Sequence, residues 1–272
     1  MGSTPLQPLG AVAGSLGALA AHGVRVTVVT AVLNRAATLP ACLASVGEQT
    51  HPEVEHVLVD GGSTDGSVEL IRKKPRPGAW VSEPDGGLYE AVNKGIGLAT
   101  GDVLGVLGAD DVYEDATVLA RVAARFADPA VDAVYGDLRY VTGDPPRVVR
   151  TWVSGPYVQG TFRRGWMPPH PTFFARRELF ARYGLHDTRL RIAADYELML
   201  RFVERHGVRL AYLPAFLVRM RLGGVSNAPR NLVRKTREDL LAWRLNGLRG
   251  GRRAVLLKNL RKLPQLVGRA TA

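Results

Sequence analysis

The feature that most constrains the fold is an alternation of short apolar runs with helix-like segments. The first run, at residues 24–32, is rich in β-branched residues, as expected of a buried parallel strand. Further runs follow at 55–59, 80–82 and 103–107, with helical spacing of apolar residues between them. This alternation predicts an α/β fold with a doubly wound, mostly parallel sheet and helices on both faces.

Polar side chains follow the predicted strands at the points where the strands end. These residues are Asn34, Asp60, Asp85, Asp110 and Asp111. The carboxyl ends of parallel strands share one edge of a sheet, and ligands bind at that edge. We therefore expect these acids and this amide to surround a common site.

The second half of the chain is less regular. We expect strands at 131–140 and 210–213, a turn at 143–146, a rigid extended segment at 168–171, and helices at 177–183 and 194–205. We divide the chain into an extension (1–22), a catalytic domain (23–229, with halves 23–111 and 112–229) and a tail (230–272). Residues 1–22 read as a loosely ordered extension, since their apolar run is too short to span a bilayer and no basic residue precedes it.

Charge is concentrated at the end of the chain. The net charge is +11, and residues 230–272 hold 12 Lys or Arg against 2 Asp or Glu. Apolar residues recur at helical spacing in 254–267, which suits either a helix on an anionic membrane or one packed on the enzyme. The nearly neutral body and the lack of aromatic residues among the basic ones argue against a nucleic-acid binder. The single Cys42 permits no intrachain disulfide and favours a reducing compartment, hence a cytoplasmic protein.

Several polar residues have both a functional and a structural interpretation. Asp110 and Asp111 are hard oxygen ligands that suit Mg²⁺ or Mn²⁺, but Asp111 could instead cap a helix near Tyr113. Asp60 precedes a turn at 61–66 and could accept a ligand N–H or simply belong to that turn. Lys94 could neutralise phosphate or lie in solvent.

Two residues of the second half are candidates on the acceptor side. Asp195 stands at the start of an apolar helix, where it could act as a general base or simply complement the helix dipole. His170 lies between prolines that fix its backbone, which suits a residue lining a site. Arg191 could add positive charge near a diphosphate.

Taken together, these segments resemble the family 2 glycosyltransferases, which have the GT-A fold. The matching stretches are TAVLNR (30–35), VDGGSTDG (59–66), SEPDGGLY (82–89), NKG (93–95), LGADD (107–111), HPTFF (170–174) and ADYEL (194–198). Each is modestly specific, but their order and spacing are highly specific, and they cover residues 24–227.

The resemblance implies roles for individual residues. Asp60 would contact the base of a uridine-type nucleotide, Asp110 and Asp111 would hold the divalent ion, and Asp195 would be the catalytic base. The donor-binding set would be Thr30, Asn34, Arg35, Asp60, Asp85, Lys94, Asp110 and Arg191. Three residues depart from the family pattern: Gly108 replaces the first acid of its DxD motif, Ala194 the usual Glu, and Gly61 a frequent second Asp.

We therefore expect an inverting, metal-dependent glycosyltransferase that moves a sugar from a nucleotide diphosphate donor, a UDP-sugar, to an acceptor hydroxyl. The acceptor would be a glycan or a lipid-linked glycan of the cell surface, and residues 230–272 could contact the inner face of the plasma membrane. A nucleotidyltransferase acting on a sugar phosphate is the alternative within the same fold class, although residues 30–38 lack its glycine-rich basic loop.

Overall fold

The computed structural model describes residues 23–74, 78–223 and 231–261, so the predicted extension at 1–22 lies outside it. Its first half alternates strand and helix as expected. The elements are β1 (Val26–Val32), α1 (Leu39–Gly47), β2 (Val54–Asp60), α2 (Ser67–Arg72), β3 (Trp80–Ser82), α3 (Leu88–Leu98) and β4 (Val103–Val106). Strands β3, β2, β1 and β4 lie side by side in that order, and all are parallel.

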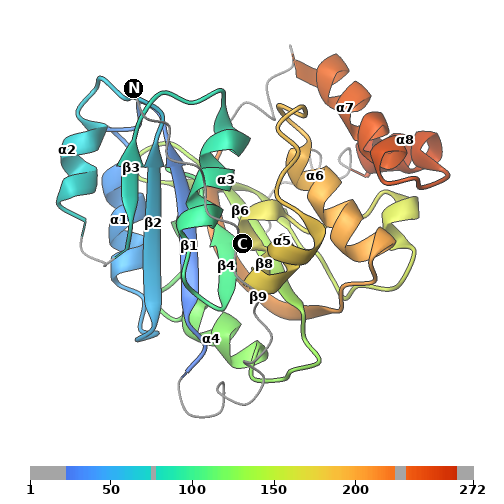
Figure 1. Cartoon of the computed structure of the whole chain (residues 1–272), viewed down its shortest axis with the longest axis horizontal. Helices are drawn as coiled ribbons and strands as arrows, with labels where there is room; N and C mark the ends of the chain where they lie inside the picture. The colour runs from blue at the N-terminus through green and yellow to red at the C-terminus, as the bar shows by residue number, and fades with distance from the viewer. Residues whose placement is uncertain (1–22, 75–77, 224–230, 262–272) are drawn as a thin grey trace, which may run out of the picture.

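The second half extends the same sheet with mixed strand directions. Its elements are β5 (Val112–Tyr113), α4 (Val118–Arg125), β6 (Ala133–Thr142), β7 (Arg147–Trp152), η1 (Thr161–Arg164), η2 (His170–Thr172), β8 (Phe174–Arg176), α5 (Arg177–Tyr183), α6 (Ala194–Met199), η3 (Leu200–Arg205), β9 (Leu210–Arg221), α7 (Leu232–Leu245) and α8 (Gly251–Leu260). Strand β8 pairs antiparallel with β4 and β6, while β6 and β9 are parallel. The sheet is thus continuous across both predicted halves (Figure 1).

The structure differs from the sequence prediction at four places. The strand predicted to end at 213 continues to Arg221, because Pro214 falls in an irregular stretch opposite Gly136 where it need not donate a ladder hydrogen bond. The helix predicted at 194–205 changes to π-type hydrogen bonding at Leu200. The segment at 168–171 enters a 3₁₀ turn at His170, and a short strand rather than a helix follows Asp111.

Apolar side chains pack on both faces of the sheet. In β1, Val28 belongs to one core cluster and the adjacent Val29 to another, as alternation along a strand requires. The first cluster includes Cys42 of α1 and Leu119 of α4, whereas the second includes residues of α3, α5 and α6. This confirms the predicted helices on both sides.

The C-terminal helices α7 and α8 pack against the end of the molecule that carries α6 (Figure 1). Leu256 and Leu260, which share the apolar face of the predicted tail helix, are 60% and 47% exposed and so do not pack on the enzyme, whereas Lys258 is buried together with Ala254 and Val255. Helical spacing identified an apolar stripe, but the contact is made by smaller residues and by a buried ion pair. Residues beyond 261 lie outside the described part of the chain. No helix among the described residues is long and apolar enough to cross a bilayer.

Candidate active site

The loop after β1 is joined to the turn after β2 by side-chain hydrogen bonds. Asn34 has a positive φ of 52°, its backbone N–H donates to Ser63 Oγ at 2.8 Å, and its Oδ1 accepts the Thr64 N–H at 2.9 Å. Asp65 accepts the Ala36 N–H at 2.8 Å. The VDGGSTDG stretch therefore builds the edge of the sheet as well as supplying polar groups to it.

Asp60 lies at the carboxyl end of β2 with one oxygen saturated and one without a partner. Its Oδ2 accepts hydrogen bonds from the N–H groups of Gly62 and Ser63 and from Ser82 Oγ, at 3.0, 2.9 and 2.7 Å. Burial alone raises the pKa of Asp60, but hydrogen bonds from Ser63, Ser82 and Gly62 together lower it below the ordinary value. Within the described residues Oδ1 has no hydrogen-bond donor, although the Asp60 side chain is fully buried.

The two other donor candidates of β1 and its loop differ in exposure. Thr30 is fully buried and its hydroxyl lies 3.1 Å from His56 Nε2, so its side chain links β1 to β2. Arg35 is exposed beside Asn34, with its guanidinium 3.4 Å from the Asn34 carbonyl oxygen.

Asp85 folds back over the turn that follows Asp60. Its Oδ1 accepts the Gly87 N–H at 2.9 Å, and a Cβ on Gly61 would come within 2.6 Å of Oδ2. Gly61 therefore leaves the space that the Asp85 carboxylate occupies. This close approach explains why the second acid frequent in the family could not stand here without displacing Asp85.

The two predicted cations of the donor side are held by different partners. Lys94 pairs with Glu83 at 3.0 Å and with Glu90 at 3.5 Å, and the hydrogen bond to Glu83 is the main reason that its pKa is raised. Its charge is therefore already compensated. Arg191 donates to the Gly86 carbonyl oxygen at 3.1 Å and so reaches the loop that precedes α3 from the segment before α6.

Asp110 and Asp111 direct their carboxylates toward the space beside Gly108. A Cβ built there would lie 2.6 Å from Asp111 Oδ2 and 3.2 Å from Asp110 Oδ1. Asp111 does not cap a helix; its Oδ1 accepts the Arg221 N–H at 3.0 Å. Burial, reinforced by the neighbouring Asp110 charge, raises the pKa of Asp111 to about 7.

These two acids fit a divalent ion only with help from a ligand. The described residues contain no group of three His, Cys, Asp or Glu side chains that could hold a metal. Mg²⁺ commonly takes one or two carboxylates and completes its shell with water and substrate phosphates. Two converging carboxylates are compatible with that arrangement.

Asp195 lies in the first turn of α6. The two N–H groups just before this helix, those of Ile192 and Ala193, donate to Glu238 Oε2 of α7 at 2.7 and 3.0 Å. Burial lowers the pKa of His170 and the Asp195 carboxylate opposes this effect; both residues line the same cavity. Tyr89 of α3 is also near Asp195, which adds to the effect of burial in raising the tyrosine pKa.

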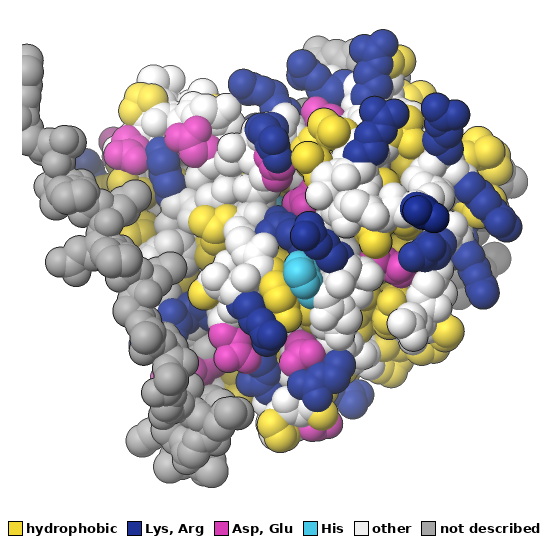
Figure 2. Space-filling view, turned by 45° about the vertical axis from the view of Figure 1, so that its right-hand side comes forward, with side chains coloured by type: hydrophobic (Ala, Val, Ile, Leu, Met, Phe, Trp, Pro, Cys, Tyr) yellow, Lys and Arg dark blue, Asp and Glu magenta, His cyan; other side chains and the backbone are white. Residues whose placement is uncertain are grey.

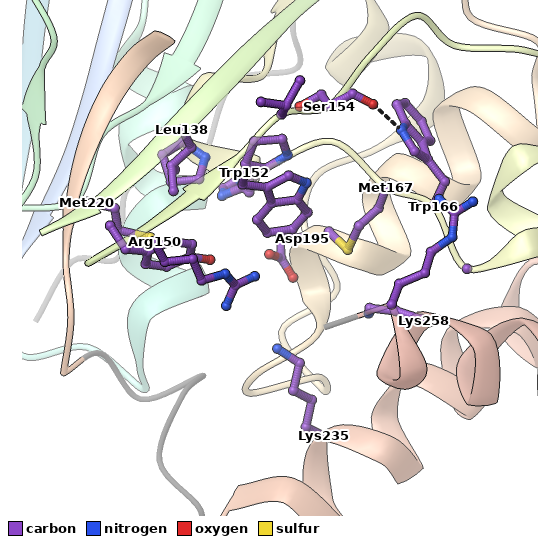
Figure 3. Close-up of a pocket in the computed structure, with 17 residues that line it drawn as sticks. Leu138, Arg150, Trp152, Ser154, Trp166, Met167, Asp195, Met220, Lys235 and Lys258 are labelled. Atoms are coloured by element: carbon purple, nitrogen blue, oxygen red, sulfur yellow. Dashed lines mark hydrogen bonds between the residues drawn. The ribbon is translucent and has the colours of Figure 1, made fainter. Parts of the chain in front are cut away.

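A cavity of about 200 Å³ opens beside Asp195 (Figure 3). Its lining includes Asp195, His170, Tyr140, Trp152 and Met220. Burial raises the pKa of Tyr140, Arg150 opposes this, and both the Asp111 and Asp195 carboxylates raise it further. Asp195 therefore lines this cavity, whereas Asp110 lines a separate pocket together with Arg219 and Arg221, and Asp111 is buried.

Sequence reasoning missed the part that α7 and α8 play in this site. Glu238 and Asp239 are the only acids in residues 230–272, and both are buried, at 9% and 1% exposed. Two adjacent acids in a strongly basic segment were the available signal. Trp243 Nε1 also donates to the Tyr196 hydroxyl at 2.9 Å, and Asn246 to Glu197 Oε1 at 3.1 Å.

Comparison with known proteins decides the family. The sequence model described as glycosyl transferase family 2 matches residues 27–184. The chain is a family 2 glycosyltransferase. This glycosyltransferase is 33% identical over 250 residues to a PGL/p-HBAD biosynthesis glycosyltransferase of Mycobacterium bovis, covering 90% of this chain and 93% of that protein. It is also 33% identical over 186 residues to an uncharacterized glycosyltransferase of Mycobacterium tuberculosis, covering 65% of this chain and 68% of the other.

Solved structures agree on the fold of this glycosyltransferase. A mannosyltransferase from Pyrobaculum calidifontis, solved with GDP-Man and Mn²⁺, aligns with a TM-score of 0.65 at 20% identity, covering 91% of this chain and 74% of that one. TarS of S. aureus, solved with UDP-GlcNAc, aligns with a TM-score of 0.62 at 16% identity, covering 88% and 73%. At these identities the comparison establishes the GT-A-type fold.

Proposed function

We propose that this family 2 glycosyltransferase moves a sugar from a nucleotide diphosphate donor, a UDP-sugar, to an acceptor hydroxyl with inversion at the anomeric carbon. The acceptor would belong to a cell-surface glycan or glycolipid. The observation that carries the proposal is the pair of carboxylates of Asp110 and Asp111 beside Gly108, together with Asp195 in the lining of a cavity formed by a distant part of the chain. The proposal is also supported by two structural neighbours that were solved with nucleotide sugars, GDP-Man and UDP-GlcNAc.

The donor would lie along the carboxyl ends of β1, β2 and β4. Asp60 Oδ1 would accept a base N–H, since it is the oxygen that lacks a donor. Asp85, Asn34 and Arg35 would border the nucleoside, and Arg191 would approach the diphosphate from the acceptor side.

A divalent ion would be held by Asp110 and Asp111, as Mg²⁺ or Mn²⁺, and it would neutralise charge developing on the nucleotide diphosphate. The chain's own part is to place two carboxylates side by side at Gly108 and to fix Asp111 through the Arg221 N–H. Removal of divalent ions with EDTA is expected to stop turnover, and added Mg²⁺ or Mn²⁺ to restore it. Full turnover in EDTA would exclude this part of the proposal.

On the acceptor side, Asp195 would accept the proton of the attacking hydroxyl. Glu238 fixes the start of α6 and thereby the position of Asp195, while His170 and Tyr140 line the approach. General base assistance of this kind contributes roughly 10²–10⁴-fold in rate. Attack from the side opposite the leaving diphosphate inverts the anomeric carbon.

The test is Asp195→Asn beside Asp128→Asn, a control at an exposed aspartate. We expect Asp195→Asn to reduce nucleotide diphosphate release at least about 10²-fold while donor binding, measured by calorimetry with UDP-sugars and Mn²⁺, stays unchanged. Near-normal turnover of Asp195→Asn would remove this residue from the base role. Production of pyrophosphate from UTP and a sugar phosphate would instead identify a nucleotidyltransferase.

A second proposal concerns peripheral contact with the inner face of the plasma membrane. Exposed apolar side chains stand on α7 and α8 among basic ones: Leu232, Val233, Leu256 and Leu260 beside Arg252 and Arg253. Figure 2 shows Lys and Arg interspersed with hydrophobic side chains on this side of the molecule. Anionic lipid attracts such surfaces, and exposed leucines would enter the interface.

Vesicle flotation tests this contact. Binding to vesicles containing phosphatidylserine is expected to fall in the Leu256→Ser/Leu260→Ser variant and to persist in Leu98→Ser, an exposed leucine of α3. Equal recovery of the wild type with neutral and anionic vesicles would contradict it.

A further inference from the structure

The side chains that line the cavity beside Asp195 include more cations than carboxylates. Its lining contains a single carboxylate, that of Asp195, and four cationic side chains: Arg150, Lys235, Lys258 and Arg261. Lys258 is paired behind the lining with the buried Asp239, at 2.8 Å.

Two of these cations have no acidic partner among the described residues. No carboxylate there forms an ion pair with Lys235 or Arg261. Lys235 is partly buried, and its amine points across the hollow toward the Asp195 carboxylate (Figure 3). Burial is the main reason that the pKa of Lys258 is lowered; the paired Asp239 charge opposes this effect, and the nearby Lys235 charge adds to it. Like charges are thus crowded here, a cost that a bound anion would relieve.

Arg150 faces the same space from the opposite wall. Its guanidinium lies 4.5 Å from the ring centroid of Tyr140 and 5.8 Å from that of Trp152, so aromatic rings hold it in place. A guanidinium fixed in this way presents a planar pair of donors that matches phosphate or carboxylate oxygens. In Figure 3 it projects toward the gap between Asp195 and Lys235.

We propose that this cavity binds an acceptor that carries an oxyanion, either phosphate or carboxylate, between Arg150 and Lys235, with the acceptor hydroxyl presented to Asp195. The inference rests on the proposed function, since it names the acceptor class of the same site. Trp152, Met167 and Met220 form an apolar wall for the body of such an acceptor. The donor's own phosphates are expected beside Asp110 and Asp111, and neither residue lines this cavity.

The experiment is a tryptophan fluorescence titration of the full chain with three probes: phenyl phosphate, benzoate and the uncharged phenyl β-glucoside. Phenyl phosphate or benzoate is expected to bind more tightly than the glucoside. Lys235→Gln is expected to weaken binding of that anion by about tenfold, the effect of losing one charge-assisted contact. Arg237→Gln, an exposed position on the same helix outside the lining, should bind as the wild type does.

Comparison of the probes shows which anion the acceptor carries. A preference for phenyl phosphate over benzoate assigns the site to a phosphorylated acceptor, and the reverse to a carboxylate. Both titrations are repeated with saturating UDP and Mn²⁺; continued binding supports the proposal, and displacement by UDP overturns it by assigning the cations to the donor.

The proposal is also overturned if wild type and Lys235→Gln bind the anion equally well, or if the wild type binds neither anion more tightly than the glucoside. Circular dichroism melting of each variant controls for folding. The Lys235→Arg variant keeps the charge and should retain binding. Nucleotide diphosphate release from donor alone is measured in parallel. Binding of UDP-sugars with Mn²⁺ is measured as well. If it persists while anion binding fails, only this inference fails; if the wild type binds no nucleotide sugar, the proposed function fails.

Discussion

The pair of Lys258 and Asp239 provides the sharpest test of how the C-terminal helices are attached. Lys258 Nζ lies 2.8 Å from Asp239 Oδ1 and 3.4 Å from the centroid of the Tyr196 ring, and the two charged residues are only 4% and 1% exposed. Asp239 Oδ2 has no partner among the described residues. Loss of Lys258 therefore leaves a carboxylate buried without a counterion.

The size of the effect follows from that burial. Breaking a buried pair by removing one partner costs about 3–5 kcal/mol, whereas replacing both partners by apolar residues is often neutral. We expect Lys258→Met and Asp239→Leu each to lower the free energy of unfolding by about 3–5 kcal/mol, and the double variant to lie within about 1 kcal/mol of wild type. With a typical stability of about 5–15 kcal/mol, the single variants still fold in most of that range.

Urea unfolding followed by circular dichroism and by tryptophan fluorescence measures these values, and Trp243 on α7 reports on the region directly. Single variants that cost less than about 1 kcal/mol would show that the pair is effectively solvated. A double variant as unstable as the sum of the singles would show that the residues act independently, and either result would refute the reasoning.

Three further predictions use other parts of the sheet edge and core. Burial holds the pKa of His56 at about 3, below the unfolded value of about 6.5, so the stability that His56 contributes above pH 6.5 is lost as pH falls, by about 2 kcal/mol between pH 7 and pH 5. Because Asp111, with its pKa raised to about 7, changes stability in the opposite direction over the same range, the effect is measured as the difference in pH dependence between wild type and His56→Gln, and identical profiles of the two would contradict it. Gly61→Ala should displace Asp85 and raise the donor KM about fivefold with little loss of stability. The control Gly97→Ala, whose added Cβ has no atom within 4 Å, should leave the donor KM unchanged. Burial raises the pKa of the Cys42 thiol to about 12, so a disulfide reagent should label it only as the chain unfolds in urea; rapid labelling of the native protein would show that the helix carrying it opens locally.

The first half of the fold could be predicted because its signals are local. Runs such as 54–60 are buried on both faces and apolar throughout most of their length, and each ends in turn residues. Parallel strands then bring Asp60 and Asp110 to one edge without further information. The roles of these residues rest on the family pattern and remain proposals.

The acceptor side could not be predicted in the same way, because its contacts join distant parts of the chain. Helical spacing gives no sign that Lys258 is buried, because its partner Asp239 lies on another helix. Nothing in the sequence near Ile192 indicates that Glu238 accepts its N–H. Burial of polar groups by partners from remote segments has no periodic signal.

The attachment of α6 to α7 has a consequence for how this enzyme could diversify. Glu238 fixes the backbone that carries the proposed proton acceptor, and Lys235, one turn earlier on the same helix, faces the acceptor cavity. A sequence change that slides or rotates this helix would alter acceptor choice and reactivity at once. Chimeras between relatives should therefore exchange the stretch from 185 to the C-terminus as one cassette, since a junction between α6 and α7 would pair a proton acceptor with a scaffold shaped for a different partner.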